Sequence, residues 1–348
     1  MMNGIFSLLK RSRDFVELKI CRLLKIPPST LLFPVVWITN KCNLKCKFCD
    51  QWKTPPKLIS QELTKDEWFQ FVDALKKLHP LVVIITGGEP LLRNDIFEII
   101  KYINKRGIHT HICSNGTLID ENIAKELRNS GLNSISVSLD SFDSKVHNTL
   151  RGIECFDEVV NGINFLRRYA PKIKVGINVV INRVNFRNLY KIFPLAERLE
   201  VDMVRFDGIH TNLAYRKKPL HTFDGLLFQK EDIPELLEEL NKLIRTACKS
   251  KIGTNSKIYL KKLKDYFQGN LKSLKCYAGY ISCAVDALGN VSVCDNFEGC
   301  ENVKNKSISD IWYSASFHKM RELVHNCSEK CWDTTHGELN ICLLYTSD

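Results

Sequence analysis

Three cysteines stand close together in the segment CNLKCKFC, at positions 42, 46 and 49. A structural zinc site usually takes four ligands, commonly as two separated pairs, and no fourth cysteine or histidine lies in this segment. A [4Fe–4S] cluster usually takes four thiolates, so a loop that supplies three leaves one iron open to another ligand. Cys42, Cys46 and Cys49 are therefore predicted to hold an open iron–sulfur cluster.

This C-x3-C-x2-C motif, with the aromatic Phe48 before its third cysteine, resembles the signature of the radical S-adenosylmethionine (SAM) superfamily. The resemblance implies that the amino and carboxylate groups of SAM chelate the open iron. It further implies that an electron from the cluster cleaves SAM to methionine and a 5′-deoxyadenosyl radical, which abstracts hydrogen from a substrate. An electron donor such as flavodoxin or ferredoxin is then expected as a partner.

A second motif, GGEP at Gly87 to Pro90, follows the apolar run VVIIT. In the family that the sequence resembles, this motif receives the SAM ammonium. By the same resemblance, Ser138 and Arg151 hold the SAM carboxylate, and Asn115 and Asn178 touch the ribose or the substrate. Strand-end capping for the polar residues and a surface ion pair for Arg151 remain as alternatives. The residues expected around SAM are Phe48, Gly87, Gly88, Glu89, Pro90, Asn115, Ser138, Asp140, Arg151 and Asn178.

A second group of cysteines follows residue 275. Alternation in VDALGNVSV predicts a β-hairpin that turns at Leu-Gly-Asn. The spacing of Cys276, Gly289 and Cys294 resembles the SPASM or twitch extension of radical SAM enzymes, which implies a closed auxiliary [4Fe–4S] cluster. The ligand set expected from this resemblance is Cys276, Cys294, Cys327 and Cys331. The final C-x3-C departs from the more frequent C-x2-C, and structural zinc remains an alternative.

The other cysteines have no expected metal role. Cys283 and Cys300 stay unassigned within the tail, and four more are isolated in the sequence and expected to be core or surface thiols: Cys21, Cys113, Cys155 and Cys248. His109 and His111 alternate on one expected strand, but nothing nearby supports metal binding, so they are expected to be structural.

Six short apolar runs alternate with amphipathic helical patterns from residue 33 onward. The runs are 33–39, 82–86, 109–113, 134–139, 173–181 and 201–206, and the first three are followed by helical patterns at 63–78, 94–107 and 120–131. Asn94 and Asp120 are expected to cap the second and third helices. Continuous apolar strands between helices predict a parallel sheet covered by helices, with the ligand site at the carboxyl ends of the strands. The predicted fold is α/β, a partial (β/α)6 TIM-type barrel with a cysteine-rich C-terminal extension.

Changes in pattern divide the chain into four expected parts. Residues 1–32 form a basic amphipathic segment, 33–270 the radical SAM core with trailing helices, and 271–341 the auxiliary-cluster domain. Clear helical patterns in the later parts lie at 231–250 and 307–324. The last seven residues, 342–348, resemble the translation of a transposase adapter used in DNA library preparation, so Cys342 is not expected to be a ligand.

Composition sets the class of protein. The 348 residues are 44% hydrophobic and 26% charged, which is typical of a globular chain. Fourteen cysteines without a secretory signal or a membrane-spanning run predict a cytoplasmic, metal-binding protein. The formal charge of +11 favours an acidic partner or simply a solvated basic face, and nucleic acid is not expected. Residues 1–30 are expected either to contact a membrane surface or to cover the barrel base.

These observations favour a radical SAM enzyme that abstracts hydrogen from a substrate. A ribosomally made peptide is the first expectation for that substrate, and a small molecule, a membrane lipid or a sugar is the alternative. A non-catalytic metal-binding scaffold is the competing class of function. The intact cysteine triad and GGEP speak against a scaffold, because a scaffold does not need an open iron.

Overall fold

The structure of the chain is a computed structural model that describes residues 12–209, 225–271, 275–329 and 331–341. The expected adapter-derived end with Cys342 lies outside these residues. So do the first eleven residues of the expected basic amphipathic segment.

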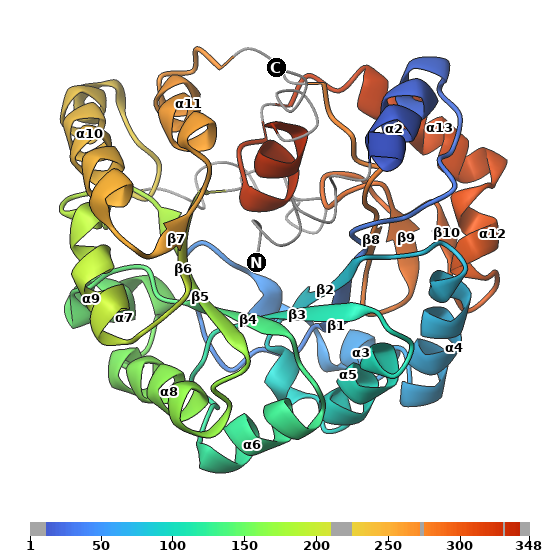
Figure 1. Ribbon diagram of the computed structural model, residues 1–348, viewed down its shortest axis with the longest axis horizontal. Helices are drawn as coiled ribbons and strands as arrows, with labels where there is room; N and C mark the ends of the chain where they lie inside the picture. The colour runs from blue at the N-terminus through green and yellow to red at the C-terminus, as the bar shows by residue number, and fades with distance from the viewer. Residues whose placement is uncertain (1–11, 210–224, 272–274, 330, 342–348) are drawn as a thin grey trace.

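The six predicted strands are present and lie parallel, in sequence order, in one curved sheet (Figure 1). They are β1 (Val35–Thr39), β2 (Val82–Gly87), β3 (His109–Ser114), β4 (Ser134–Ser138), β5 (Lys174–Ile181) and β6 (Met203–Gly208). The first strand begins later than the apolar run that predicted it, because Pro34 has no N–H to donate to a neighbouring strand. The predicted partial barrel is confirmed.

Four shorter strands extend this sheet at both edges, in the order β10-β9-β8-β1-β2-β3-β4-β5-β6-β7. They are β7 (Gly253–Thr254), β8 (Ala284–Val285), β9 (Asn290–Ser292) and β10 (Glu301–Asn302). The predicted hairpin is β8 with β9, and β8 also pairs in parallel with β1 through Ala284 opposite Val35. The C-terminal extension therefore continues the barrel sheet. This continuation was not predicted, because strands of two residues are too short to show a strand pattern in the sequence.

Helices form a ring around the outside of the sheet (Figure 1). Those after the first six strands are α3 (Pro56–Ile59), α4 (Lys65–Lys76), α5 (Ile96–Asn104), α6 (Glu121–Asn129), α7 (Ser144–Arg151), α8 (Phe156–Tyr169), α9 (Ile192–Arg198), α10 (Ile233–Lys249) and α11 (Lys257–Phe267). Asp120 caps α6 as predicted, by accepting from Ile123 N. The predicted cap Asn94 is wrong, because α5 begins after Asp95, whose carboxylate pairs with Arg93.

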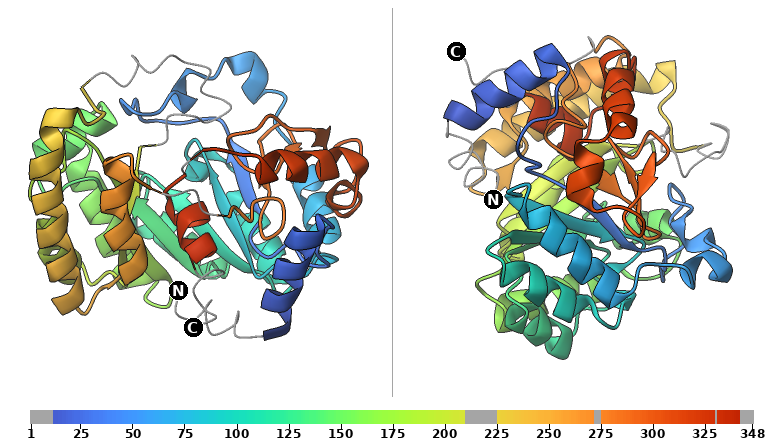
Figure 2. Two further views of the ribbon diagram at one scale, coloured as in Figure 1. Left: turned by 90° about the horizontal axis from the view of Figure 1, so that it is seen from above. Right: turned by 90° about the vertical axis from the view of Figure 1, so that its right-hand side faces the viewer.

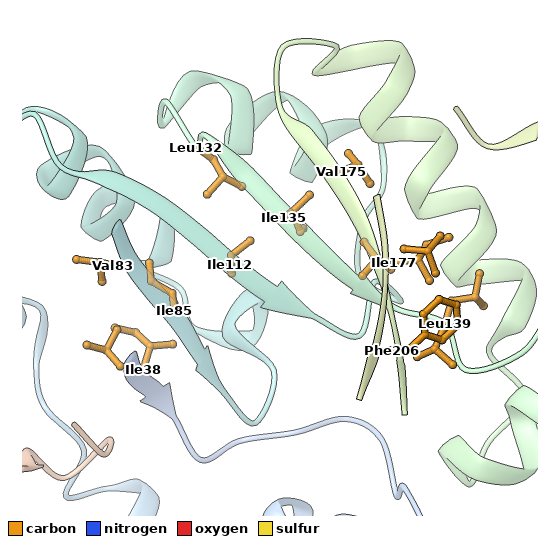
Figure 3. Close-up of a cluster of buried hydrophobic side chains, with 14 of the residues drawn as sticks. Ile38, Val83, Ile85, Ile112, Leu132, Ile135, Leu139, Val175, Ile177 and Phe206 are labelled. Atoms are coloured by element: carbon orange, nitrogen blue, oxygen red, sulfur yellow. The ribbon is translucent and has the colours of Figure 1, made fainter. Parts of the chain in front are cut away.

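The main core lies between the sheet and these helices, where Ile85, Ile112, Ile135 and Ile177 are fully buried (Figure 3). Side chains alternate between the two faces of a strand, so their neighbours face the inside of the barrel. These inner positions include polar residues such as Cys113, Ser136, Asn178 and Arg205, and the polar side chains therefore point toward the barrel interior.

The C-terminal segment contributes α12 (Ile308–Trp312), α13 (Ala315–His325) and the π-helical turn η6 (Thr334–Glu338). The predicted helix at 307–324 is divided, because Ser314 caps α13 by accepting from Phe317 N. In Figure 1, the dark red η6 lies within the ring of helices. It is held there by Thr334 N donating to Asp207 Oδ1 at 2.7 Å and by Glu338 Oε1 accepting from Ser256 N at 3.0 Å.

The N-terminal helix α2 (Ser12–Leu24) lies beside α13 (Figures 1 and 2). Leu18 and Cys21 are buried on its inner face and pack with Phe33, which precedes β1, and with Val82 at the start of β2. This packing supports the expectation that the helix covers the barrel base. None of the helices in the described part of the chain is both long and apolar enough to span a bilayer.

Candidate functional site

The cysteine triad lies on the loop that follows β1, and this loop alternates between buried and exposed residues. Leu44, Cys46 and Phe48 are buried, whereas Lys45 and Lys47 point to solvent. The buried side chains share an apolar cluster with Leu150 of α7, against which Cys42 and Cys49 also pack. The loop therefore brings three thiols to one sheltered place while its charges stay in water.

Burial also sets the protonation of these thiols. It raises the pKa of Cys42 to about 11, and it raises the pKa of Cys46 as well, where the nearby Arg151 opposes it. Iron binds thiolates, so loading a cluster here must release protons. The chemistry of this donor set, three soft thiols in an apolar setting, fits an iron–sulfur cluster.

Glu62 holds the base of the triad loop. Its carboxylate accepts from Thr39 Oγ1 at 2.8 Å and from Asn40 N at 2.6 Å, and Gln51 Nε2 donates to Asn40 Oδ1 at 2.5 Å. Sequence reasoning missed Glu62, because a single glutamate between two motifs carries no recognisable pattern. Its position becomes evident only when the loop after β1 folds back over it.

The GGEP segment crosses the same loop at close range. Gly88 N donates to Thr39 O at 2.8 Å, and Glu89 N donates to Lys41 O at 2.7 Å. A Cβ atom on Gly88 would lie 1.9 Å from Lys41 O, and Gly87 has a φ of +134°. Both glycines are required, because no larger residue fits this approach or adopts this backbone easily.

Glu89 is completely buried at the end of β2. Its carboxylate accepts from Ser114 Oγ at 2.9 Å, Asn115 N at 2.7 Å and Leu91 N at 3.1 Å. Burial raises the pKa of Glu89 to about 7, although these hydrogen bonds act to lower it. A ligand cation that reached this carboxylate would favour its ionised form.

Arg151 and Asp140 form a buried ion pair, with 2.7 Å between Nη2 and Oδ2. The alternative of a surface ion pair for Arg151 is wrong, because α7 carries this residue inward under the triad loop. Its guanidinium lies over the ring of Phe48, 5.2 Å from the centroid, and Nη1 is 3.8 Å from Cys46 Sγ. This arrangement joins the end of β4 to the triad.

Cys155 lies in the same neighbourhood, although it is isolated in the sequence. It is a buried thiol as expected, but its Sγ is 3.6 Å from His147 Nε2, and it belongs to the apolar cluster around Cys46. The tight turn at Gly152, with a φ of +77°, returns the chain from α7 to this position. No sequence spacing relates Cys155 to the triad.

Ser138 and Asn178 are register partners on β4 and β5, at the barrel end where the triad lies. The side-chain oxygen of Asn178 is buried and has no hydrogen-bond partner among the described residues. Asn115 extends its Nδ2 to Asn43 Oδ1 at 2.8 Å, beside Cys42 in the triad loop. A ligand with hydroxyl or amine donors would satisfy the Asn178 oxygen, so these residues fit a bound SAM.

Four C-terminal cysteines line one small cavity together with His336. They are Cys276, Cys294, Cys327 and Cys331. Two of their sulfurs accept hydrogen bonds, at 3.4 Å from Ala278 N to Cys276 and at 3.1 Å from Asn296 Nδ2 to Cys331. Such bonds to sulfur accompany cluster ligands. Cys283 and Cys300 do not line this cavity.

The spacing of these thiols bears on the choice of metal. Among the described residues, no three His, Cys, Asp or Glu side chains converge closely enough to bind a single metal ion. Tetrahedral zinc draws its ligands to about 2.0–2.3 Å from one centre, whereas a cubane distributes its thiolates over four irons. The four cysteines around a shared cavity can supply the four thiolates that a cubane needs.

His336 was not predicted as part of this site. Its Nδ1 lies 3.0 Å from Asp333 Oδ2, and this carboxylate raises the pKa of His336 to about 10 although burial acts to lower it. His336 lies on the turn η6, which folds back toward the cysteines and so brings the imidazole ring to the cavity. Sequence reasoning had no signal for it.

A larger cavity, of about 760 Å³, is lined by residues that follow β1 and by residues of the C-terminal hairpin and the segment after it. Asn40 and Asp50 line it from the triad loop, and Asp286 and Asn290 line it from the C-terminal hairpin. Phe297 lines both this cavity and the four-cysteine cavity, so it forms a wall between them. The volume is typical of a pocket that takes a small molecule or part of a larger one.

Comparisons with known proteins agree with this geometry. A family model described as the radical SAM superfamily matches residues 36–193, and one described as an iron–sulfur cluster-binding domain, SPASM, matches residues 276–333. An AdoMet-dependent heme synthase of Nitratidesulfovibrio vulgaris is 26% identical over 315 residues, which cover 85% of this chain and 83% of the relative. The mycofactocin maturase MftC of Mycobacterium tuberculosis is 27% identical over 298 residues, covering 82% of this chain and 71% of that protein.

Solved structures give the same fold. Streptococcus suis SuiB bound to the precursor peptide SuiA aligns with a TM-score of 0.66 at 19% identity, and the alignment covers 97% of this chain and 75% of SuiB. The similarity extends over both the barrel and the C-terminal segment. At this level of identity it supports the architecture alone.

Proposed function

Because this chain belongs to the radical SAM superfamily and carries a SPASM domain, it is a radical SAM enzyme, and we propose that its substrate is a ribosomally made peptide. In this proposal, the reacting side chain of the peptide enters the cavity of about 760 Å³ between the triad loop and the C-terminal hairpin.

The first cluster binds at the triad, with Cys42, Cys46 and Cys49 proposed as its ligands. When bound, this cluster and SAM together supply the electron transfer and the 5′-deoxyadenosyl radical that abstracts hydrogen. Glu89 is proposed to receive the SAM ammonium, because it is a buried carboxylate near Cys42 whose partners are neutral hydrogen-bond donors. Gly87, Gly88 and Pro90 give that carboxylate its close approach.

The remaining groups around SAM have proposed roles as well. Ser138 and Arg151 are proposed to hold the SAM carboxylate, with Asp140 fixing the guanidinium from behind. Asn115 and Asn178 are proposed to contact the ribose or the substrate, since the Asn178 oxygen lacks a partner among the described residues. Phe48 is proposed to shelter the cluster from water.

The auxiliary cluster is proposed to bind Cys276, Cys294, Cys327 and Cys331. Four thiolates close the coordination, so this cluster is not expected to bind SAM. Phe297 lines both the four-cysteine cavity and the proposed substrate cavity, which supports a position of the cluster next to the substrate. Electron transfer to or from the substrate, or placement of the substrate, is the role we propose for it.

The observation that carries the peptide proposal is this cavity between the triad loop and the C-terminal hairpin. Its walls come from segments far apart in the chain, and the similar fold of SuiB is known with the precursor peptide SuiA bound. A second relative, the mycofactocin maturase, is named for the maturation of mycofactocin. A volume of this size takes a side chain and its neighbouring residues.

A tetrapyrrole-like small molecule is the second candidate substrate. The relative named as a heme synthase matches over most of both chains, which favours this class. A planar macrocycle would have to lie within the same cavity, against Trp37 and Phe297, which both line it. The two candidates therefore compete for one site.

Several finer expectations belong to the same proposal. The electron donor is proposed to be a flavodoxin or a ferredoxin, and the enzyme is proposed to work in the cytoplasm. We keep the proposed division into 1–32, 33–270 and 271–341, with 342–348 as an adapter-derived end. Contact of residues 1–30 with a membrane surface is proposed as well.

The test begins with anaerobic reconstitution with iron and sulfide, followed by reduction in the presence of SAM. Formation of 5′-deoxyadenosine is the expected result, and its absence from fully loaded protein would refute the assignment of the chemistry to this chain. Candidate precursor peptides and a tetrapyrrole, each deuterated, are then added in separate reactions. Deuterium in 5′-deoxyadenosine from the peptide reactions supports the peptide, and deuterium only from the tetrapyrrole assigns the second candidate.

A further inference from the structure

Helix α2 presents apolar side chains to solvent on the face that points away from the core. Of the eleven exposed large hydrophobic residues in the described part of the chain, five lie between positions 16 and 26. Four of them, Val16, Ile20, Leu23 and Leu24, are spaced as one face of a helix and are called the outer stripe below. Leu23 is 79% exposed and Leu24 is 60% exposed.

The opposite face of α2 already stabilises the fold. Leu18 and Cys21 are buried there, and Arg22 Nε donates to Cys276 O at 2.7 Å while its guanidinium lies 5.3 Å from the centre of the Tyr277 ring. After the helix, Trp312 Nε1 donates to Pro28 O at 2.9 Å. These contacts hold α2 in place without the outer stripe, so the stripe is not explained by folding.

Two lysines lie next to the outer stripe. Lys19 lies on α2, and Lys25 directly follows it and is exposed. The sequence before and within the helix adds Lys10, Arg11 and Arg13, against which only Asp14 and Glu17 stand. An apolar helix face with lysines nearby, in a segment of net positive charge, favours a helix that lies in the plane of an anionic membrane interface.

The chemistry of the outer stripe distinguishes lipid from protein as its partner. The stripe consists of valine, isoleucine and leucine, with no aromatic side chain. Hot spots of protein interfaces are enriched in Trp, Tyr and Arg, and Leu and Val are under-represented there. Flexible aliphatic side chains flanked by lysine are suited to insertion among lipid chains below a layer of anionic headgroups.

We infer that the outer stripe of α2 docks the enzyme on an anionic bilayer surface, with the helix axis parallel to that surface. The helix inserts its four aliphatic side chains, and Lys19 and Lys25 face the headgroups. Because Arg22 joins α2 to the backbone of Cys276, docking places the proposed auxiliary cluster site on the membrane side of the molecule. This inference does not depend on the identity of the substrate.

The test is flotation of the full-length reconstituted enzyme with phosphatidylcholine vesicles, with and without phosphatidylserine. The wild type is expected to float only with the anionic vesicles, and less so at high salt. The variant Ile20→Glu/Leu23→Glu is expected to lose about tenfold or more in bound fraction, because the buried aliphatic surface is replaced by charge. The matched control is Ile153→Glu/Ile258→Glu, which changes two exposed isoleucines elsewhere and is expected to float like the wild type.

Three outcomes would overturn the inference. The first is equal flotation of the Ile20→Glu/Leu23→Glu variant and the wild type. The second is a wild type that fails to float, with a dimer by light scattering that the same variant converts to a monomer, which assigns the stripe to a second copy. The third is flotation only after deletion of residues 1–9, which assigns the stripe to the chain's own first residues.

Production of 5′-deoxyadenosine without vesicles serves as the check on folding. It is expected to be unchanged in both double variants, since neither alters a residue of the proposed active site. A failure of the membrane inference would leave this readout intact, whereas a failure of the proposed function would remove it from the wild type too.

Discussion

The guanidinium of Arg151 reaches the thiol of Cys46, with 3.8 Å between Nη1 and Sγ, although 105 positions separate the two residues in the chain. Asp140 holds the same guanidinium from the other side. A cation beside a thiol favours the thiolate, and a thiolate is the form that binds iron. This buried group therefore links the end of β4 to the proposed cluster ligands.

Removal of one partner of that ion pair is expected to destabilise the protein strongly. Arg151→Met leaves the buried Asp140 carboxylate without its partner, and such losses cost about 3–5 kcal/mol. Urea unfolding of the cluster-free protein measures the change. The double variant Arg151→Met/Asp140→Asn is expected to lose less than the sum of the single variants, and strictly additive losses would contradict the pairing.

Loss of one triad cysteine is expected to abolish SAM cleavage. Cys46→Ala removes a proposed ligand, so the drop in 5′-deoxyadenosine should exceed the about 10–100-fold effect of losing an outer-shell partner. The matched control is Cys248→Ala, which removes an exposed cysteine. Retention of wild-type turnover in Cys46→Ala would refute the assigned triad.

The close approach of GGEP to the triad loop predicts that Gly88→Ala is not tolerated. Its added methyl group would collide with Lys41 O, which is backbone and cannot move aside without shifting the loop. Gly107→Ala is the control, because its Cβ meets nothing within 4 Å and it should cost only the about 1–2 kcal/mol of a left-handed residue. Cluster content and thermal unfolding compare the two, and equal behaviour would argue against the close approach.

SAM binding is expected to strengthen as the pH rises toward neutrality. Burial raises the pKa of Glu89 to about 7, so below that value the neutral form dominates and cannot pair with the SAM ammonium. Affinity should fall roughly tenfold for each pH unit below the pKa and level off above it. Equilibrium dialysis of the reconstituted enzyme at several pH values measures this. Glu89→Gln should bind weakly at every pH, and a wild-type profile equally flat would exclude the role.

The C-terminal cysteines are expected to account for half of the bound iron. Cys294→Ala should lose the auxiliary cluster, because the proposed site needs four thiolates and only three of them, with His336, remain around the cavity. The control, Cys283→Ala, changes a buried cysteine of the same segment that does not line the cavity. Iron analysis and electron paramagnetic resonance distinguish the two clusters. Equal iron in both variants would contradict the proposed ligand set.

The elements of the fold that have a clear local sequence pattern could be predicted. Six strands were predicted because each has a run of apolar residues long enough to show the strand pattern. The strands β7 and β8 have two residues each, and their pairing depends on contacts distant in sequence. Asn94 was expected to cap α5, but the pairing of Arg93 with Asp95 shifts the start of the helix.

The site divides in the same way. The triad and GGEP are recognisable because their residues are adjacent in sequence. Glu62, Cys155 and His336 come to the two groups of cysteines through tertiary contacts, and none belongs to a local motif. The burial of Arg151, likewise, follows from the packing of α7 under the triad loop rather than from the sequence around it.

The pairing of β8 with β1 has a consequence for how the enzyme is made. The two strands lie near opposite ends of the chain, so a ribosome that adds about 5–20 residues per second needs roughly 12–50 s to reach β8 after completing β1. Throughout that interval the edge of β1, which leads directly into the cysteine loop, lacks its neighbour. The strand that leads into the triad loop therefore stays an open edge until about 245 further residues have been made, and it pairs with β8 only after that.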